Sequence, residues 1–217
     1  MMRRVPPRRI AYHQPHCLGC GPENPGSLGL AFEIDDDRVR TELVLDRRHE
    51  GAPGFAHGGA VATAFDDTLG TLLIVLKRPG VTAKLEVNYR RPLFLGRRYE
   101  LEAWVESVDG RKMWLAAEAR EEGELVADAR ALFLEVDIAH FAQSQADGTL
   151  PEGWGRSWRR DPELPDLRVQ PVAQPAAPRD PERARGPRAD RSDRALDPRA
   201  GLEGGAAGPV EAGQGLC

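Results

Sequence analysis

The sequence predicts an α+β fold in which an antiparallel sheet of about six strands wraps around one long central helix. Six short segments fit strands and are separated by tight-turn signals, whereas a single segment has helical periodicity. The resulting order is two strands, one apolar helix and four further strands. A single sheet curved around one helix satisfies that order.

Turn signals define the expected hairpins. Asp109-Gly110 is a strong two-residue hairpin signal, and Glu122-Gly123 precedes the last strand. The acidic run at residues 35–37 separates the first two strands. The strands are predicted at residues 28–34, 39–45, 81–89, 99–108, 113–119 and 125–136.

The helix is predicted at residues 58–77. This segment has no proline and few charges, and Pro79-Gly80 ends it. Twenty helical residues are about 30 Å long. The helix is apolar on nearly all sides, so we expect it to be enclosed. Its apolar residues recur at helical spacing: Val61, Phe65, Leu69, Leu72 and Leu76.

Composition limits the possible partners and the location. The chain has 217 residues and a formal net charge of −4, which does not favour nucleic acid or an anionic membrane as a partner. No signal-peptide pattern is present, and the apolar stretch at residues 69–76 is too short to span a bilayer. We therefore expect a cytoplasmic protein.

The chain divides into three parts. Residues 1–15 are rich in Arg and Pro and are expected to be a flexible arm, followed by a folded domain at residues 16–140. Residues 141–217 are expected to be a mostly disordered tail, because ten of the 18 prolines fall there and no aromatic residue follows Trp158. A short helix or coil near residues 138–145 is expected to cap the domain.

The first candidate for chemistry is His57-Gly58-Gly59, at the start of the helix. Two glycines leave the first amide N–H groups uncovered, and these amides have no partner within the helix. Together with the helix dipole they suit a carbonyl oxygen that gains negative charge. The alternative is that the glycines merely let the helix begin close to the sheet.

The second candidate is the pair Asp66-Asp67, which holds the only ionisable groups between residues 60 and 76. An unpaired carboxylate on an enclosed helix is costly, and a general base or a nucleophile would explain it. The alternative is an aspartate that is exposed or at an interface and bonds Thr63 or Thr68. Glu50, in the loop before the helix, could orient a water or could simply be solvated.

Three stretches carry a resemblance to a known family. They are "EGAPGFAHGGAVATAFDD" at residues 50–67, "HCLGCGPENPGSLGL" at residues 16–30 and "TAKLEVNYRRPLFLGRRYELEAWV" at residues 82–105. In this order they resemble the hotdog-fold acyl-CoA thioesterases of the PaaI type. In that family an HGG motif opens the central helix and an acidic residue follows nine positions after the histidine, which selects Asp66 over Asp67.

The resemblance implies roles for the site residues. The N–H of Gly58 would polarise the carbonyl of the thioester. Asp66 would either activate water or attack directly, and the hydroxyl of Thr82 would help to place the water. The activity implied is hydrolysis of an acyl-CoA to a free acid and CoA, with no cofactor.

The resemblance also bears on His57, Gly59 and Glu50. His57 could be a base, although in this motif its ring more often bonds the backbone and shapes the turn, and Gly59 would contact the substrate. Glu50 stands where the family often has Gln or Asn. This departure matters because an ionised carboxylate can only accept hydrogen bonds.

The resemblance also implies partners. Hotdog domains pair so that the sites lie between subunits, so we expect a homodimer or homotetramer in which Asp66 of one copy faces Gly58 of the other.

Two other functions stay open: another hotdog enzyme that hydrates or dehydrates acyl thioesters, and a non-catalytic module that binds acyl-CoA. The phosphates of CoA need cations near the pocket. The candidates are Arg90, Arg91, Arg97 and Arg98. The alternative is that these four arginines are ordinary solvated charges at the end of a strand.

A cluster of potential ligands lies at the junction of the arm and the domain: His13, His16, Cys17 and Cys20. These four could form a zinc or redox site, but four ligands within eight residues are unusually compact. Gly21, Pro22, Pro25 and Gly26 indicate a loop around them. We therefore expect these cysteines to pack the loop, and we expect no metal.

Overall fold

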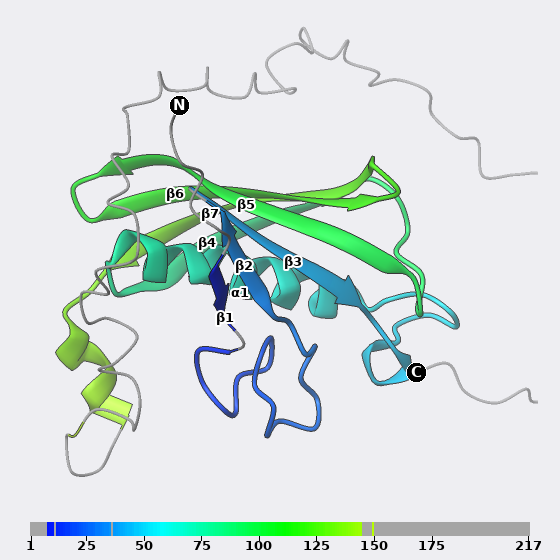
Figure 1. The fold of residues 1–217 in the computed structure, drawn as a ribbon, viewed down its shortest axis with the longest axis horizontal. Helices are drawn as coiled ribbons and strands as arrows, with labels where there is room; N and C mark the ends of the chain where they lie inside the picture. The colour runs from blue at the N-terminus through cyan, green and yellow to red at the C-terminus, as the bar shows by residue number, and fades with distance from the viewer. Residues whose placement is uncertain (1–7, 11, 36, 145–148, 150–217) are drawn as a thin grey trace, which may run out of the picture. The chain divides into compact units, whose positions relative to one another are not determined.

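The computed structural model describes residues 8–10, 12–35, 37–144 and 149, all within one compact unit, Met1–Gln174. Its sheet has seven antiparallel strands in the order β1-β2-β3-β5-β6-β7-β4 (Figure 1). The strands are β1 (Arg8–Ile10), β2 (Phe32–Asp35), β3 (Arg38–Val44), β4 (Gly80–Tyr89), β5 (Arg98–Asp109), β6 (Lys112–Glu121) and β7 (Glu124–Glu135). The antiparallel sheet and the one long helix confirm the predicted fold class. Nearly all of the expected tail lies outside the described residues.

Two differences from the expected strands lie near the N-terminus. Arg8–Ile10, within the segment expected to be an arm, forms β1 and pairs with β2. The first predicted strand was wrong at its start, since β2 begins at Phe32 and not at residue 28. The reason is that the N–H groups of Leu28 and Leu30 donate to the carbonyls of Leu18 and Gly19 (2.9 and 3.0 Å). These two hydrogen bonds fold residues 12–31, here called the lead-in loop, back on themselves.

The helix α1 (Gly58–Leu76) lies along the inner face of the sheet (Figure 1). His57 is its N-cap, and Lys77 ends it in a left-handed conformation with φ 56°. The N–H of Arg78 then donates to the carbonyl of Leu73, which closes the last turn. Its buried side chains form the core with the inner residues of β2, β3, β5, β6 and β7; they are Val61, Ala64, Phe65, Leu69, Leu72, Leu73 and Val75.

The opposite face of α1 is only half-buried. We expected the helix to be enclosed on nearly all sides, but within one chain the sheet encloses only one face. Ala62, Thr63, Asp66, Asp67 and Gly70 lie on that other face. By length and apolar composition α1 could cross a membrane, and it is longer than the apolar stretch we identified in the sequence. Its burial against the sheet accounts for the same properties.

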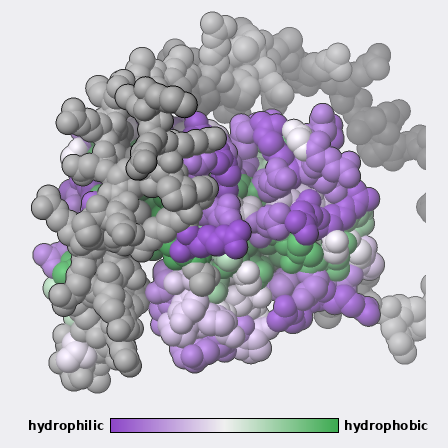
Figure 2. Space-filling view, viewed as in Figure 1, coloured by the Kyte–Doolittle hydropathy of each residue, from purple (hydrophilic) through white to green (hydrophobic). Residues whose placement is uncertain are grey.

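The outer face of the sheet is polar and carries ion pairs between strands. Arg40 bridges Asp35 and Glu102, and Arg130 pairs with Glu106 while stacking on Trp114. On the face seen in Figure 2, an apolar band lies between hydrophilic regions, at the level that α1 occupies in Figure 1. The short helix expected after the last strand is present as the 3-10 helix η2 (Ile138–Ser144).

Candidate active site

Asp66 lies midway along α1 and is held by a residue of the edge strand β4. The hydroxyl of Thr82 donates to its Oδ1 at 2.9 Å. Burial raises the pKa of Asp66, the hydrogen bond from Thr82 lowers it, and the nearby Cys17 raises it, so that the net shift is upward. A carboxylate kept partly out of water in this way is a stronger base than a solvated one.

Asp66 also lines a pocket of about 170 Å³ between α1 and the sheet. The pocket is mostly apolar, and Thr82 lines it together with Asp66. The other lining residues are His13, Asp67, Gly70, Thr71, Leu73, Ile74, Gly80 and Phe133. An apolar pocket with a carboxylate in its wall suits an acyl group whose carbonyl lies beside that carboxylate.

Two side chains form hydrogen bonds with the backbone at the start of α1. The Nδ1 of His57 accepts the N–H of Gly59 at 2.9 Å, and the hydroxyl of Tyr89 donates to the carbonyl of Gly58 at 2.6 Å. Gly58 is exposed, and no acceptor among the described residues lies within hydrogen-bond reach of its N–H. The N–H of Gly58 is therefore available to a ligand, whereas that of Gly59 is engaged by His57. Tyr89 was not identified from the sequence, because its contact crosses from β4 to the helix and leaves no local pattern.

Gly58 and Asp66 do not meet within one chain. Eight residues separate them along α1, and a rise of 1.5 Å per residue places them about 12 Å apart. A thioester carbonyl spans only about 1.2 Å from carbon to oxygen, as any carbonyl does. One carbonyl group therefore cannot contact both residues of the same copy.

Glu50 is turned into its own loop. Its Oε1 accepts the N–H of Gly54 at 2.7 Å, and its backbone forms a bridge with Ala56. Gly54 has a φ of 81°, which only glycine adopts easily, so the loop bends here around the carboxylate. In a single chain Glu50 thus holds the turn that precedes α1.

The four arginines predicted to bind phosphate each have an acidic partner. Arg90 and Arg91 pair with Asp128 and Glu124, and both line a surface pocket of about 340 Å³ that also contains Gly58 and Tyr89. The other two lie outside that pocket: Arg97 pairs with Glu121 and stacks on Phe94, and Arg98 pairs with Glu42. The structure therefore brings Arg90 and Arg91, and not Arg97, beside the start of the helix.

Asp67 points to the lead-in loop and not to Thr82. Burial raises the pKa of Asp67 to about 7. Its Oδ1 lies 3.3 Å from the Sγ of Cys17, whose own pKa is lowered to about 3 through hydrogen bonds with Cys20 and His13, against the effect of burial. The Sγ of Cys17 donates the hydrogen bond that joins it to the Oδ1 of Asp67. The contact between Asp67 and Cys17 joins residues 50 positions apart, and sequence reasoning missed it.

Known proteins resemble this chain over the helix and the strands that follow it. Residues 53–127 match the family model described as "Thioesterase superfamily". Acyl-coenzyme A thioesterase THEM4 of Xenopus laevis is 37% identical over 89 residues, which are 40% of each chain. The Bos taurus protein of the same name is 33% identical over 117 residues, 50% of this chain and 48% of that protein. The chain thus spans less than half the length of these curated relatives.

A solved structure agrees with this likeness. The protein RHA08564, described as a thioesterase superfamily protein, superposes with a TM-score of 0.53 at 32% identity. The match covers 56% of this chain and 61% of that one. Sequence and fold point to the same group: residues 53–127 match the thioesterase superfamily, and the sheet with its one long helix has the hotdog arrangement of that group.

Proposed function

We propose that this protein hydrolyses the thioester bond of an acyl-CoA, releasing a free acid and CoA. The observation that carries the proposal is Asp66, a half-buried carboxylate that is held by Thr82 and lines a mostly apolar pocket. The similarity to proteins named acyl-coenzyme A thioesterase supports the substrate class.

The complete site is proposed to form between two copies of the chain. Within one copy, Gly58 and Asp66 are too far apart to act on one carbonyl group. If two helices lay antiparallel, the start of one would come beside the middle of the other, so that each pair would form two equivalent sites. β4 could bring this about, because it is a ten-residue edge strand with one side unpaired in the sheet order, and it carries Thr82. A tetramer would arise if two such dimers packed together.

In the proposed reaction Asp66 accepts a proton from a water molecule, and the water oxygen bonds to the carbonyl carbon of the thioester. The carbonyl oxygen becomes negatively charged and accepts the N–H of Gly58 from the partner copy. The carbon–sulfur bond then breaks, and CoA leaves as a thiolate that takes up the proton held by Asp66, which restores the carboxylate. In the other possible route Asp66 attacks the carbon itself, forming an anhydride that water cleaves in a second step. Both routes begin from the ionised carboxylate and the same oxyanion contact.

His57 and Glu50 are proposed to shape the site and not to transfer protons. The ring of His57 is committed through Nδ1 to the N–H of Gly59, which fixes the first turn of the helix. Glu50 is similarly committed to Gly54. Together these bonds leave the N–H of Gly58 exposed at a rigid helix start.

Arg90 and Arg91 are proposed to bind the phosphates of CoA. They share a surface pocket with Gly58, so a thioester bound at the helix start could extend its nucleotide end over them. Their present partners are surface ion pairs, which contribute little and can be exchanged for phosphate.

A thiol-release assay tests the proposal. The purified chain would be mixed with a panel of acyl-CoAs and a reagent that reports free thiols, beside the Asp66→Asn variant. Asp109→Asn, a change of the same kind at an exposed hairpin tip, serves as the control. We expect release of CoA by the wild type and the control, and a loss of about 100-fold or more in Asp66→Asn.

Other results would reject the proposal in different ways. A change in enoyl absorbance without thiol release would identify a hydratase. Saturable binding of acyl-CoA with neither change would identify a non-catalytic binding module. Equal activity in Asp66→Asn and the wild type would exclude Asp66 as the reacting carboxylate.

A further inference from the structure

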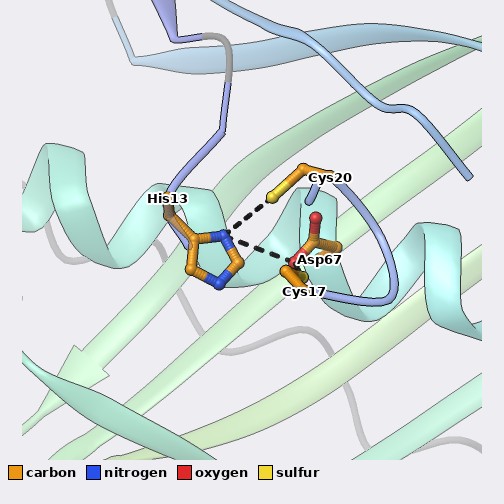
Figure 3. A group of neighbouring side chains, drawn as sticks. All are labelled: His13, Cys17, Cys20 and Asp67. Atoms are coloured by element: carbon orange, nitrogen blue, oxygen red, sulfur yellow. Dashed lines mark hydrogen bonds and ion pairs between the residues drawn. The ribbon is translucent and has the colours of Figure 1, made fainter. Parts of the chain in front are cut away.

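Four potential metal ligands converge beside α1. His13, Cys17 and Cys20 come from the lead-in loop, and Asp67 comes from the helix (Figure 3). The Nδ1 of His13 lies 3.1 Å from the Sγ of Cys20 and 3.6 Å from the Oδ1 of Asp67, which is 3.3 Å from the Sγ of Cys17. All four ligand atoms lie within 4.8 Å of one another.

These separations fit a tetrahedral metal site. With zinc–ligand bonds of about 2.0 to 2.3 Å, the ligand atoms of a zinc tetrahedron lie about 3.3 to 3.8 Å apart. Three of the six separations are 3.1, 3.3 and 3.6 Å, and the other pairs lie within 4.8 Å, so side-chain movements of about 1 Å would bring the group into coordination. The objection that four ligands within eight residues are too compact does not apply to this set. The fourth ligand is Asp67, 47 residues beyond Cys20, whereas His16 is exposed and pairs with Glu23.

Asp67 has a buried oxygen without a hydrogen-bond partner. Its Oδ2 is shielded from solvent, and among the described residues no donor reaches it. The side chain as a whole is only 11% exposed. A buried carboxylate oxygen in this condition costs free energy unless a cation or a donor compensates it. A metal ion bound to Asp67 would supply that compensation.

The loop backbone is built closely around the cluster. A Cβ on Gly19 would lie 2.4 Å from the Cγ and Oδ2 of Asp67, so only glycine allows the loop to cover the carboxyl group. A Cβ on Gly21 would lie 2.3 Å from the backbone nitrogen of Cys17. The N–H of Gly19 donates to the Sγ of Cys17 at 3.3 Å, which stabilises negative charge on that sulfur. The Cys-x-x-Cys-Gly turn thus presents both sulfurs to one point.

We propose that this group binds one zinc ion through His13 Nδ1, the sulfurs of Cys17 and Cys20, and a carboxylate oxygen of Asp67. Two thiolates and an imidazole favour zinc over magnesium or calcium, which prefer oxygen ligands. Four protein ligands close the coordination sphere, as in structural zinc sites, so the ion has no open position for a reacting water. Binding releases the protons that the thiol and carboxyl groups hold.

The site would control the position of the lead-in loop beside Asp66. Cys17, Leu18 and Gly19 line one surface pocket together with Asp66 and Thr82. A zinc ion that joins Cys17 to Asp67 would fix this wall of the pocket against the helix. The inference stands on the loop and Asp67, and it holds whether or not the protein is a hydrolase.

Metal analysis of the full chain, purified without a polyhistidine tag and without chelator, tests the proposal. We expect about one zinc ion per chain in the wild type and less than about a tenth of that in Cys17→Ser and Cys20→Ser. His16→Ala is the matched control, because His16 lies in the same loop outside the cluster, and it should retain the ion. The proposal would be overturned if the wild type held much less than one zinc ion per chain and added zinc did not raise that amount. Loss of zinc from His16→Ala would also overturn it.

Cobalt substitution gives a second readout that does not depend on the folding of variants. The wild-type chain, stripped with a chelator and refilled with Co²⁺, should show the visible bands of tetrahedral cobalt and a sulfur-to-cobalt charge-transfer band. Removing the metal should lower the Tm by at least about 5 °C, and added zinc should restore it. A disulfide between Cys17 and Cys20 in the freshly purified chain, or an octahedral cobalt spectrum, would overturn the proposal.

Discussion

The hydroxyl of Thr82 donates a hydrogen bond of 2.9 Å to the Oδ1 of Asp66, and this bond joins the edge strand β4 to the central helix. It fixes one oxygen of the carboxylate and thereby orients the other. Because the bond favours the ionised form of Asp66, it also opposes the effect of burial on that group.

Replacing Thr82 tests this orientation. Thr82→Val keeps the shape of the side chain and removes the donor, so we expect kcat to fall by about 10- to 100-fold, the value of one hydrogen bond to a charged group. Thr82→Ser retains the hydroxyl and should keep most of the activity. Steady-state kinetics on both variants would measure this, and equal losses in the two would show that the hydroxyl is not what matters.

Gly58 offers a way to delete a single N–H group. It is the first residue of α1, where proline is tolerated, and His57 before it has φ −65° and ψ 132°, which suits a residue that precedes proline. We expect Gly58→Pro to lower kcat by about 100- to 1000-fold through loss of the oxyanion contact, with little change in Tm.

Gly58→Ala is the matched control for that change. It keeps the N–H, and its Cβ would lie 3.4 Å from the Tyr89 hydroxyl, which is tolerable. Thiol-release assays should find Gly58→Ala much more active than Gly58→Pro. A fully active Gly58→Pro would remove this N–H from the mechanism.

The arginines beside the helix start are expected to act on the nucleotide end of the substrate. Changing Arg90 and Arg91 together to Ala should raise KM for an acyl-CoA by about 5- to 10-fold, because two charge-assisted contacts are lost. The same variant should treat an acyl-pantetheine, which lacks the nucleotide, like the wild type. Arg97→Ala, outside the pocket, is the control. If KM rose equally for both substrates, these arginines would act on a part of the substrate other than the nucleotide.

Gly19 is expected to be required by packing. A Cβ there would overlap Asp67, so Gly19→Ala should lower the free energy of unfolding by about 1 to 3 kcal/mol. Gly26→Ala, in the same loop, is the control, because its Cβ would have no neighbour closer than 3.4 Å. Denaturant unfolding of both variants would measure the difference. Equal stability would mean that the loop does not pack on Asp67 as described.

Local patterns predicted much of this fold. The period of the apolar residues predicted α1, which ends within a residue of the expected limit, and Asp109-Gly110 predicted the turn between β5 and β6. The patterns failed where the partner is distant in sequence. The turn signal at residues 35–37 suggested a strand from residue 28, but the backbone N–H groups of Leu28 and Leu30 donate to the lead-in loop. β1 has only three residues, too few to carry a period.

The site was predictable to a similar degree. The nine-residue spacing from His57 selected Asp66, and the structure places Thr82 beside it. Nothing in the sequence indicated that Asp67 would form a hydrogen bond with Cys17. Nor did it indicate that Arg97 would pair with Glu121 and stack on Phe94. Such contacts depend on how the sheet curves over the helix, and residue order alone does not specify that curvature.

Complementation between two inactive variants tests most directly the claim that Asp66 of one copy works with Gly58 of another. Asp66→Asn and Gly58→Pro would be co-expressed with different tags, and the mixed dimers would be compared with each variant alone. Each mixed dimer has one intact site and one doubly altered site, so a random mixture should recover about a quarter of wild-type activity. Mixed dimers as inactive as either parent would contradict a site shared between copies.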